Sequence, residues 1–250
     1  MDKYKAFCLD LDGTVYRGNQ AIPEAVAFID KLQKKGTDPF YITNNSSMTQ
    51  AQLQKKLSLF GIKTDQEHIM TSAIAAAKYC KKNFNGLSVM MIGEKGLEEA
   101  LEMEEIFVTR TSPDVVIMGI DREISYAKLE DACLAIRAGA HFIATNSDGA
   151  FPTERGLVPG NGSFVRLMET ATGKIPMFVG KPEPHMLGFI QAGNGFRKDE
   201  MVMIGDNYET DILAGIYFGI DTIHVEGGVT SREEVIMKEV QPTYQLSALM

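Results

Sequence analysis

Short apolar segments alternate with amphipathic helical patterns along almost the whole chain of 250 residues, and this alternation limits the folds open to it. Segments with the length and composition of buried strands lie at residues 5–11, 39–43, 69–70, 89–92, 115–118, 142–144, 201–204 and 222–225. Helical patterns lie between them at residues 23–35, 72–84, 96–103, 126–138, 185–192 and 208–218. Ser231 and Glu234 have the capping-box spacing of a further short helix. Strands separated by helices pair in parallel, so we expect an α/β protein with Rossmann-like parallel sheets.

Composition and charge exclude several classes of protein. With 44% hydrophobic and 23% charged residues the chain is typical of folded proteins, and the net charge of −8 argues against a nucleic-acid partner. No apolar run approaches the roughly 20 residues that cross a bilayer, so we expect no membrane partner. Residues 1–5 lack the features of a signal peptide, and Cys8, Cys80 and Cys133 are scattered without metal-binding or redox spacing. The sequence therefore predicts a cytoplasmic protein with reduced thiols.

Two acidic residues, Asp10 and Asp12, follow the first apolar segment in the run Asp-Leu-Asp-Gly-Thr. Residues two apart in an extended segment project to the same side, and open α/β folds bind ligands at the carboxyl ends of their strands. Two acids that lie so close repel each other unless a cation, a proton or hydrogen bonds compensate. Mg²⁺ is the natural cation for phosphate chemistry. The alternative, from these five residues alone, is a turn that merely closes a strand.

With its partner motifs, this run resembles the first motif of the haloacid dehalogenase-like superfamily, Asp-x-Asp-x-Thr. Thr43, which ends an apolar segment in Ile-Thr-Asn-Asn, matches the second motif, a hydroxyl that binds the phosphoryl group, and Asn44 next to it is a further candidate to bind the phosphate. Lys181, in Gly-Lys-Pro-Glu-Pro, matches the third motif, a lysine that neutralises charge. Residues 205–211 match the fourth motif, which supplies acidic metal ligands or their supports. Each motif alone has a structural alternative, but all four occur in order, each at an expected strand end or helix start.

The resemblance implies a role for each matching residue. Asp10 would be the nucleophile and form an aspartyl-phosphate, and Asp12 would be the general acid and base. Asp10, the backbone carbonyl of Asp12 and Asp206 would bind Mg²⁺, with Asp211 supporting these ligands or binding through water. Asp206 and Asp211 could also cap a helix, and both interpretations can hold together. An acid at position 12 favours phosphatase or phosphomutase chemistry, because dehalogenases of the superfamily lack it and the transporting ATPases carry Thr there.

A gap of 138 positions separates Thr43 from Lys181, which is more than an α/β core needs and too long for a structureless loop. We therefore expect a catalytic core at residues 1–80 and 178–250, interrupted by an inserted α/β cap domain at residues 81–177. The length and position of the insertion resemble the large caps of the NagD, p-nitrophenyl phosphatase and pyridoxal phosphatase branch, subfamily IIA. So do three of its segments, residues 144–148, 158–162 and 171–173.

Polar residues of this insertion are candidate substrate contacts. Asn146 and Asp148 follow the expected strand at residues 142–144, where a cap would face its substrate, although the cluster could also serve only as a turn. Residues 156–163 are expected to be a glycine-rich turn that leads into a helix, rather than a second phosphate site.

These features predict a Mg²⁺-dependent phosphatase of small phosphomonoesters such as sugar phosphates, nucleoside monophosphates or pyridoxal phosphate. Two alternatives stay open: a phosphotransferase or phosphomutase that passes the phosphoryl group to another alcohol, and a sensor that binds a phospho-ligand without turnover. The complete set of acids argues against the sensor, which need not keep both Asp10 and Asp12. The resemblance also makes a homodimer formed through the cap an option for this chain.

Overall fold

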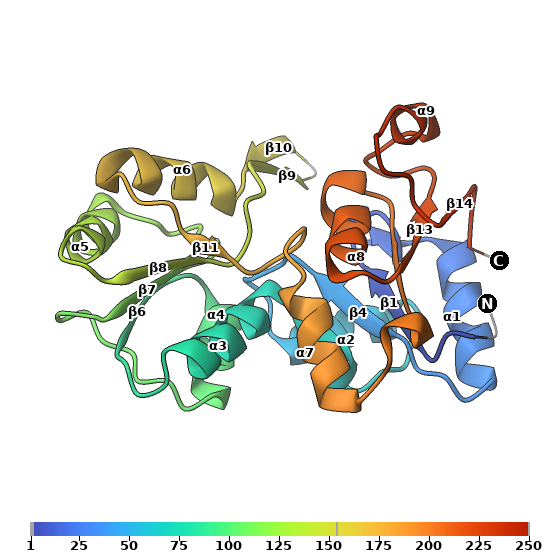
Figure 1. Ribbon diagram of the computed structural model, residues 1–250, viewed down its shortest axis with the longest axis horizontal. Helices are drawn as coiled ribbons and strands as arrows, with labels where there is room; N and C mark the ends of the chain where they lie inside the picture. The colour runs from blue at the N-terminus through green and yellow to red at the C-terminus, as the bar shows by residue number, and fades with distance from the viewer. Residues whose placement is uncertain (1–2, 154, 250) are drawn as a thin grey trace. The chain divides into compact units, whose positions relative to one another are not determined.

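The computed structural model describes residues 3–153 and 155–249, which form two compact units (Figure 1). Within that part of the chain the first unit comprises residues 3–43, 50–70 and 181–249, and the second comprises residues 44–49 and 71–180. These bounds differ from the insertion expected at residues 81–177, because residues 44–49 and helix α3 (Ser72–Asn83) pack within the second unit. That the second unit serves as a cap stays a prediction.

The first unit is built on a six-stranded sheet. Its strands, in spatial order, are β14 (Tyr244–Leu246), β13 (Asp221–Val225), β12 (Met201–Gly205), β1 (Ala6–Asp10), β4 (Phe40–Thr43) and β5 (Ile69–Thr71). β1 pairs in parallel with both β12 and β4, and β13 pairs in parallel with β12 and β14. Every residue of β1, β4 and β12 is buried, as in strands covered on both faces. The α/β class expected from the sequence is confirmed.

The described residues of the first unit form helices α1 (Pro23–Lys34), α2 (Gln50–Leu59), α7 (His185–Asn194), α8 (Leu213–Phe218) and α9 (Arg232–Ile236). All of them except α2 lie at helical patterns or at the capping box named above. Proline opens α1, which buries Ala25, Phe28, Ile29 and Leu32 on one face. The capping box expected for α9 is present: Ser231 Oγ accepts from the Glu234 backbone N–H at 3.3 Å, and Glu234 Oε2 accepts from the Ser231 N–H at 2.8 Å. The helix expected at residues 208–218 begins with a π-helical turn, Tyr208–Ile212, before α8.

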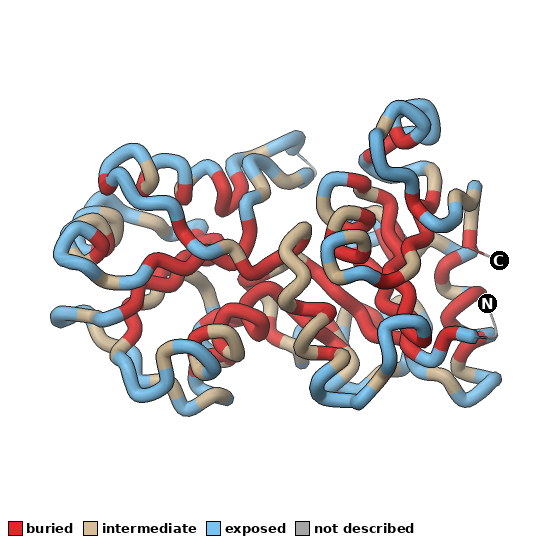
Figure 2. Tube along the Cα trace, in the orientation of Figure 1, coloured by how far each residue is buried: buried red, intermediate tan, exposed pale blue. Residues whose placement is uncertain are grey.

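A four-stranded parallel sheet forms the centre of the second unit. Its order is β11 (Met177–Phe178), β8 (His141–Ala144), β7 (Val115–Met118) and β6 (Val89–Ile92). Helices α5 (Tyr126–Arg137) and α6 (Asn161–Thr172) lie on one side of it, and α3 and α4 (Lys95–Met103) lie on the other (Figure 1). Met90, Val116, Ile136, Val165 and Met168 belong to the core between α5, α6 and the sheet. Figure 2 shows the strands of both sheets as largely buried.

The glycine-rich turn expected at residues 156–163 is wrong for its first half. Residues Gly156–Pro159 form strand β10, which pairs antiparallel with β9 (Ala150–Thr153), and α6 begins at Asn161. The Thr153 hydroxyl donates to the Gly156 carbonyl at 2.8 Å and closes the hairpin. Pro152 in β9 and the glycines of residues 156–163 are typical of loops. Residues 156–159 are extended because they pair with β9.

Two further features concern the described chain as a whole. No helix in the described residues is both long enough and apolar enough to cross a membrane. Cys8, Cys80 and Cys133 are free, the first two of them buried.

Candidate active site

Asp10 is the last residue of β1, the strand that lies between β12 and β4 in the sheet of the first unit. Its side chain is buried at the carboxyl end of the strand. Because the strands paired with β1 run parallel to it, their carboxyl ends meet at this edge, and Asp206, which follows β12, and Thr43, which ends β4, lie at the same edge as Asp10. The strand order β12-β1-β4 therefore determines which residues lie near Asp10.

The chain turns back sharply after Asp12. Gly13, at φ +102°, adopts a backbone conformation that other residues rarely take, and its N–H donates to the Tyr16 carbonyl at 2.8 Å. This turn brings the Tyr16 hydroxyl to Asp12, where it donates to Oδ2 at 3.2 Å. Asp12 is exposed overall, but the protein around its carboxyl group removes part of that group's solvation and so raises the pKa of Asp12. The charge of Lys56 and the hydrogen bond from Tyr16 act in the opposite direction.

Asp206 follows β12 and is held by donors on both carboxylate oxygens. Oδ1 accepts from the Thr14 hydroxyl at 3.0 Å, and Oδ2 accepts from the Val229 backbone N–H at 2.7 Å. The loop that carries Val229 packs directly against this carboxylate: a Cβ on Gly228 would lie 1.8 Å from Oδ2. The backbone carbonyl of Asp206 also accepts from the buried His224 ring at 3.2 Å. Asp206 is thus fixed from several directions.

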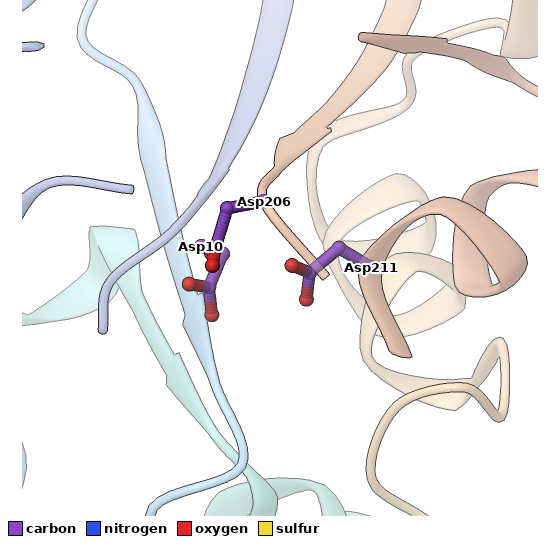
Figure 3. A group of neighbouring side chains, drawn as sticks. All are labelled: Asp10, Asp206 and Asp211. Atoms are coloured by element: carbon purple, nitrogen blue, oxygen red, sulfur yellow. The ribbon is translucent and has the colours of Figure 1, made fainter. Parts of the chain in front are cut away.

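Lys181 and Asp211 complete the cluster. The Lys181 ammonium donates to Asp10 Oδ1 at 2.5 Å, to Asp211 Oδ1 at 2.7 Å and to the Ile42 carbonyl of β4 at 3.3 Å. Asp211 Oδ2 accepts from the Asn207 backbone N–H at 3.0 Å, so the π-helical turn orients this carboxylate. Figure 3 shows Asp10 and Asp206 reaching from neighbouring strand ends, with Asp211 facing them from the helical segment.

Charges in the cluster are unevenly balanced. Burial raises the pKa of Asp10 well above its ordinary value, Asp211 adds to the effect and Lys181 opposes it. Burial and Asp211 also raise the pKa of Asp206, against the Val229 and Thr14 hydrogen bonds. For Lys181, burial disfavours the charged form, but Asp10 and Asp211 together outweigh it and raise the pKa. Three buried carboxylates thus surround a single ammonium group.

This donor set fits a hard divalent cation. One ligand oxygen from each of Asp10, Asp206 and Asp211 lies within 4.8 Å of the others. Carboxylate oxygens are the ligands that Mg²⁺ takes in phosphate-processing proteins, and a bound cation would favour the charged forms of Asp10 and Asp206. The Asp12 side chain lies outside this trio. These buried acids could therefore bind a metal ion.

The remaining residues expected in the site are divided between the two units. Thr43 ends β4 in the first unit and is buried, at the same sheet edge as Asp10. Asn44, Asn146 and Asp148 form a network of their own in the second unit. The Asn44 amide donates to Asp148 Oδ2 at 3.1 Å, and the Asn146 amide donates to the Asn44 carbonyl at 2.8 Å. Their contact with substrate stays a prediction.

Sequence reasoning missed several residues that shape this site. Thr14 is part of the first motif, but the sequence does not show that its hydroxyl binds Asp206, which lies 192 positions away. His224 lacks metal-ligand spacing and instead supports the Asp206 carbonyl. Tyr16 and Lys56 carry no local signal that would connect them with Asp12. The two consecutive glycines before Val229 indicate a turn, though not that it touches a carboxylate.

Comparison with known proteins agrees with this geometry. The family model for haloacid dehalogenase-like hydrolases matches residues 7–106, and a second model for hydrolases of the same kind matches residues 178–250. The chain is 42% identical to the 5'-nucleotidase YutF of Bacillus subtilis over 249 residues, which cover 100% of this chain and 97% of that protein. It is 43% identical to the acid sugar phosphatase of Staphylococcus aureus over 250 residues, which cover 100% of this chain and 96% of the relative.

Solved structures show the same likeness. A double mutant of the thermostable NPPase from Geobacillus stearothermophilus superposes with a TM-score of 0.93 at 43% identity, covering 99% of this chain and 97% of its own. The 4-nitrophenylphosphatase of Thermotoga maritima superposes with a TM-score of 0.94 at 31% identity, and the match covers 99% of this chain and 95% of the Thermotoga chain.

A parallel α/β sheet with this acidic cluster at its carboxyl edge, together with these relatives, defines a hydrolase of phosphoric monoesters. The chain belongs to the haloacid dehalogenase-like family, in its NagD-like subfamily IIA.

Proposed function

We propose that this phosphatase is Mg²⁺-dependent, hydrolyses small phosphomonoesters through an aspartyl-phosphate on Asp10, and uses Asp12 as its general acid and base. The observation that carries the proposal is the cluster of Asp10, Asp206 and Asp211 around the Lys181 ammonium. Asp10, Asp206 and Asp211, with the Asp12 carbonyl as a further candidate, would hold the cation. Bound there, Mg²⁺ supplies positive charge that offsets the negative charge of the transferring phosphoryl group.

The chain's own groups account for each bond change. The Asp10 carboxylate attacks phosphorus and the ester P–O bond breaks, while Asp12 donates a proton to the leaving oxygen. Asp12 then takes a proton from the water that attacks the aspartyl-phosphate, which releases inorganic phosphate and regenerates Asp10. Lys181 stabilises charge on the phosphoryl oxygens, and Thr43 binds them. Burial raises the pKa of Asp12 and so eases its protonation, which suits a group that must both donate and accept a proton.

Substrate class, assembly and location follow from the relatives and the sequence. The names of the relatives, a 5'-nucleotidase and an acid sugar phosphatase, support nucleoside monophosphates and sugar phosphates as substrates. We expect the second unit to serve as the cap that selects among them, with Asn146 and Asp148 as its candidate contacts, and Asn44 stays a candidate for binding the phosphate. A homodimer formed through that unit and a cytoplasmic location remain predictions.

Phosphate release from p-nitrophenyl phosphate tests the proposal. The wild-type protein should release phosphate in the presence of Mg²⁺, and EDTA should abolish the release until Mg²⁺ is restored. Asp10→Asn and Asp12→Asn should each lower turnover by about a hundredfold or more. Acid-quenched wild-type enzyme should carry phosphate on Asp10, which mass spectrometry of the peptide detects.

Three results would contradict the proposal. Full turnover by Asp10→Asn would remove Asp10 as the nucleophile, and full turnover in EDTA would remove the metal requirement. Transfer of phosphate to an added alcohol, in preference to water, would favour a phosphotransferase instead.

A further inference from the structure

A second cation, Lys56 of helix α2, is anchored on the aromatic ring that binds Asp12. The Lys56 ammonium nitrogen lies 3.8 Å from the centroid of the Tyr16 ring, whose hydroxyl donates to Asp12 Oδ2 at 3.2 Å. The Tyr16 side chain is fully buried and packs tilted against Phe60, with 5.5 Å between ring centroids. One buried side chain therefore contacts both the carboxyl group and the ammonium group.

The charge of Lys56 is available to a ligand. Lys56 is half-buried, and no carboxylate in the described part of the chain forms an ion pair with it. It lies in the last turn of α2, where the helix dipole favours a cation. By contrast, the Lys181 ammonium already binds Asp10 and Asp211. Burial lowers the pKa of Lys56 and the negative charge of Asp12 opposes that effect, which places the two groups within electrostatic range.

The reaction brings the leaving alcohol to this place. Asp12 must reach the ester oxygen to protonate it, so the carbons of the leaving alcohol pass beside Asp12. An anionic group two or three bonds along that alcohol then comes within range of Lys56. A carboxylate carries one negative charge, which the single charge of the Lys56 ammonium matches, whereas a second phosphate monoester carries close to two near neutral pH.

We propose that Lys56 is a specificity-determining residue that binds a carboxylate on the leaving alcohol, so that the enzyme prefers phosphate esters of hydroxy acids to those of neutral alcohols. This inference rests on the proposed phosphatase function and deepens it. The contact with the Tyr16 ring assigns this role to Lys56, because it holds the Lys56 ammonium group in place before the substrate binds.

A matched pair of esters tests the inference. 3-Phosphoglycerate and glycerol 3-phosphate share a three-carbon skeleton and differ in one terminal group, a carboxylate in the first and a hydroxymethyl in the second. Wild-type kcat/KM should favour the acid. In Lys56→Met and Lys56→Gln this preference should fall by about tenfold, mainly through a higher KM for the acid. Lys56→Arg should restore most of it, and Lys55→Met, which changes the exposed neighbour on the same helix, should keep the wild-type ratio.

The outcomes separate this inference from the proposed function. If the neutral variants lose activity equally toward both esters, Lys56 only supports Tyr16, and the inference is overturned. A wild-type enzyme that hydrolyses p-nitrophenyl phosphate but shows no preference for the acid overturns it as well. Failure of the wild type on all three esters would instead refute the phosphatase proposal on which the inference rests.

Discussion

Replacing Gly228 by alanine should disable the proposed metal site without substituting any of its ligands. The added Cβ would lie 1.8 Å from Asp206 Oδ2 and 2.3 Å from its Cγ, whereas real Cβ atoms essentially never approach closer than 3.0 Å. The carboxylate and the loop must therefore separate by at least a further 1.2 Å, the difference between 3.0 Å and 1.8 Å, through movement of one or both. Either movement strains the 2.7 Å hydrogen bond between the Val229 N–H and Oδ2.

The size of the effect follows from that displacement. Mg²⁺ tolerates little departure from ligand distances of about 2.0–2.1 Å, and a misplacement of about 1 Å can cost a hundredfold in rate. A hydrogen bond to a charged group contributes about 1.5–3 kcal/mol, which is itself a factor of about 10 to 150 in affinity. We expect Gly228→Ala to lower kcat/KM for p-nitrophenyl phosphate by about a hundredfold and to weaken Mg²⁺ binding by about 10- to 100-fold.

Two measurements follow the effect, with a matched control. Activity against Mg²⁺ concentration reports the functional requirement, and the rise of the melting temperature with Mg²⁺ reports binding without turnover. Gly193→Ala adds the same methyl group within helix α7, where it would meet no atom within 4 Å apart from its chain neighbours and the nearby backbone of its own helix. It should therefore keep the wild-type Mg²⁺ response and slightly stabilise the fold. A folded Gly228→Ala enzyme with wild-type kcat/KM and wild-type Mg²⁺ response would refute Asp206 as a ligand held by this loop.

Three further changes test other parts of the structure. Tyr16→Phe removes the hydroxyl that donates to the acid–base carboxyl group at 3.2 Å but keeps the ring, so kcat should fall by about two- to tenfold in steady-state assays; an unchanged kcat would show the hydrogen bond to be dispensable. Leu57→Ala should lower the free energy of unfolding by about 2–5 kcal/mol, because the Leu57 side chain is 0% exposed. Leu59→Ala on the same helix should change it by less than about 0.5 kcal/mol, because Leu59 is 77% exposed. Equal losses for the two variants in urea denaturation would contradict this prediction. The hydrogen bond from Lys3 holds the pKa of Asp221 in the folded protein below its ordinary value of 3.8. The charged Asp221 carboxylate therefore stabilises the fold fully above pH 3.8, and this stabilisation is lost as the pH falls through the lower pKa of the folded protein. The melting-temperature gap between the wild type and Asp221→Asn should therefore narrow under acid, and a constant gap from neutral to strongly acidic pH would contradict the assignment.

Local patterns in the sequence were enough to anticipate the elements and the main catalytic candidates. The apolar segment that ends at Asp10 is a buried strand because its composition suits a strand covered on both faces, whatever its neighbours are. Thr43 and Asp206 were assigned to the ends of other strands, and parallel pairing brings all such ends to one edge of a sheet. The capping box of Ser231 and Glu234 is likewise local, since its two partners lie three residues apart.

Pairing and packing across the chain decided what these patterns could not. Residues 156–159 became a strand because β9 offers a partner, although their own composition suggests a turn. The compact units are bounded by contacts, so residues 44–49 belong with a unit whose other residues begin at position 71.

What the sequence by itself determined is the α/β class, the order of the strands along the chain and the four motifs that carry the acids and the lysine. Only the tertiary structure decided how those acids are held. Thr14 and Val229 bind Asp206 across 192 and 23 positions, and Lys56 reaches Asp12 through the ring of Tyr16. These contacts depend on which strand lies beside which, and the spatial order β12-β1-β4 arises from the packing of the whole unit rather than from any one segment.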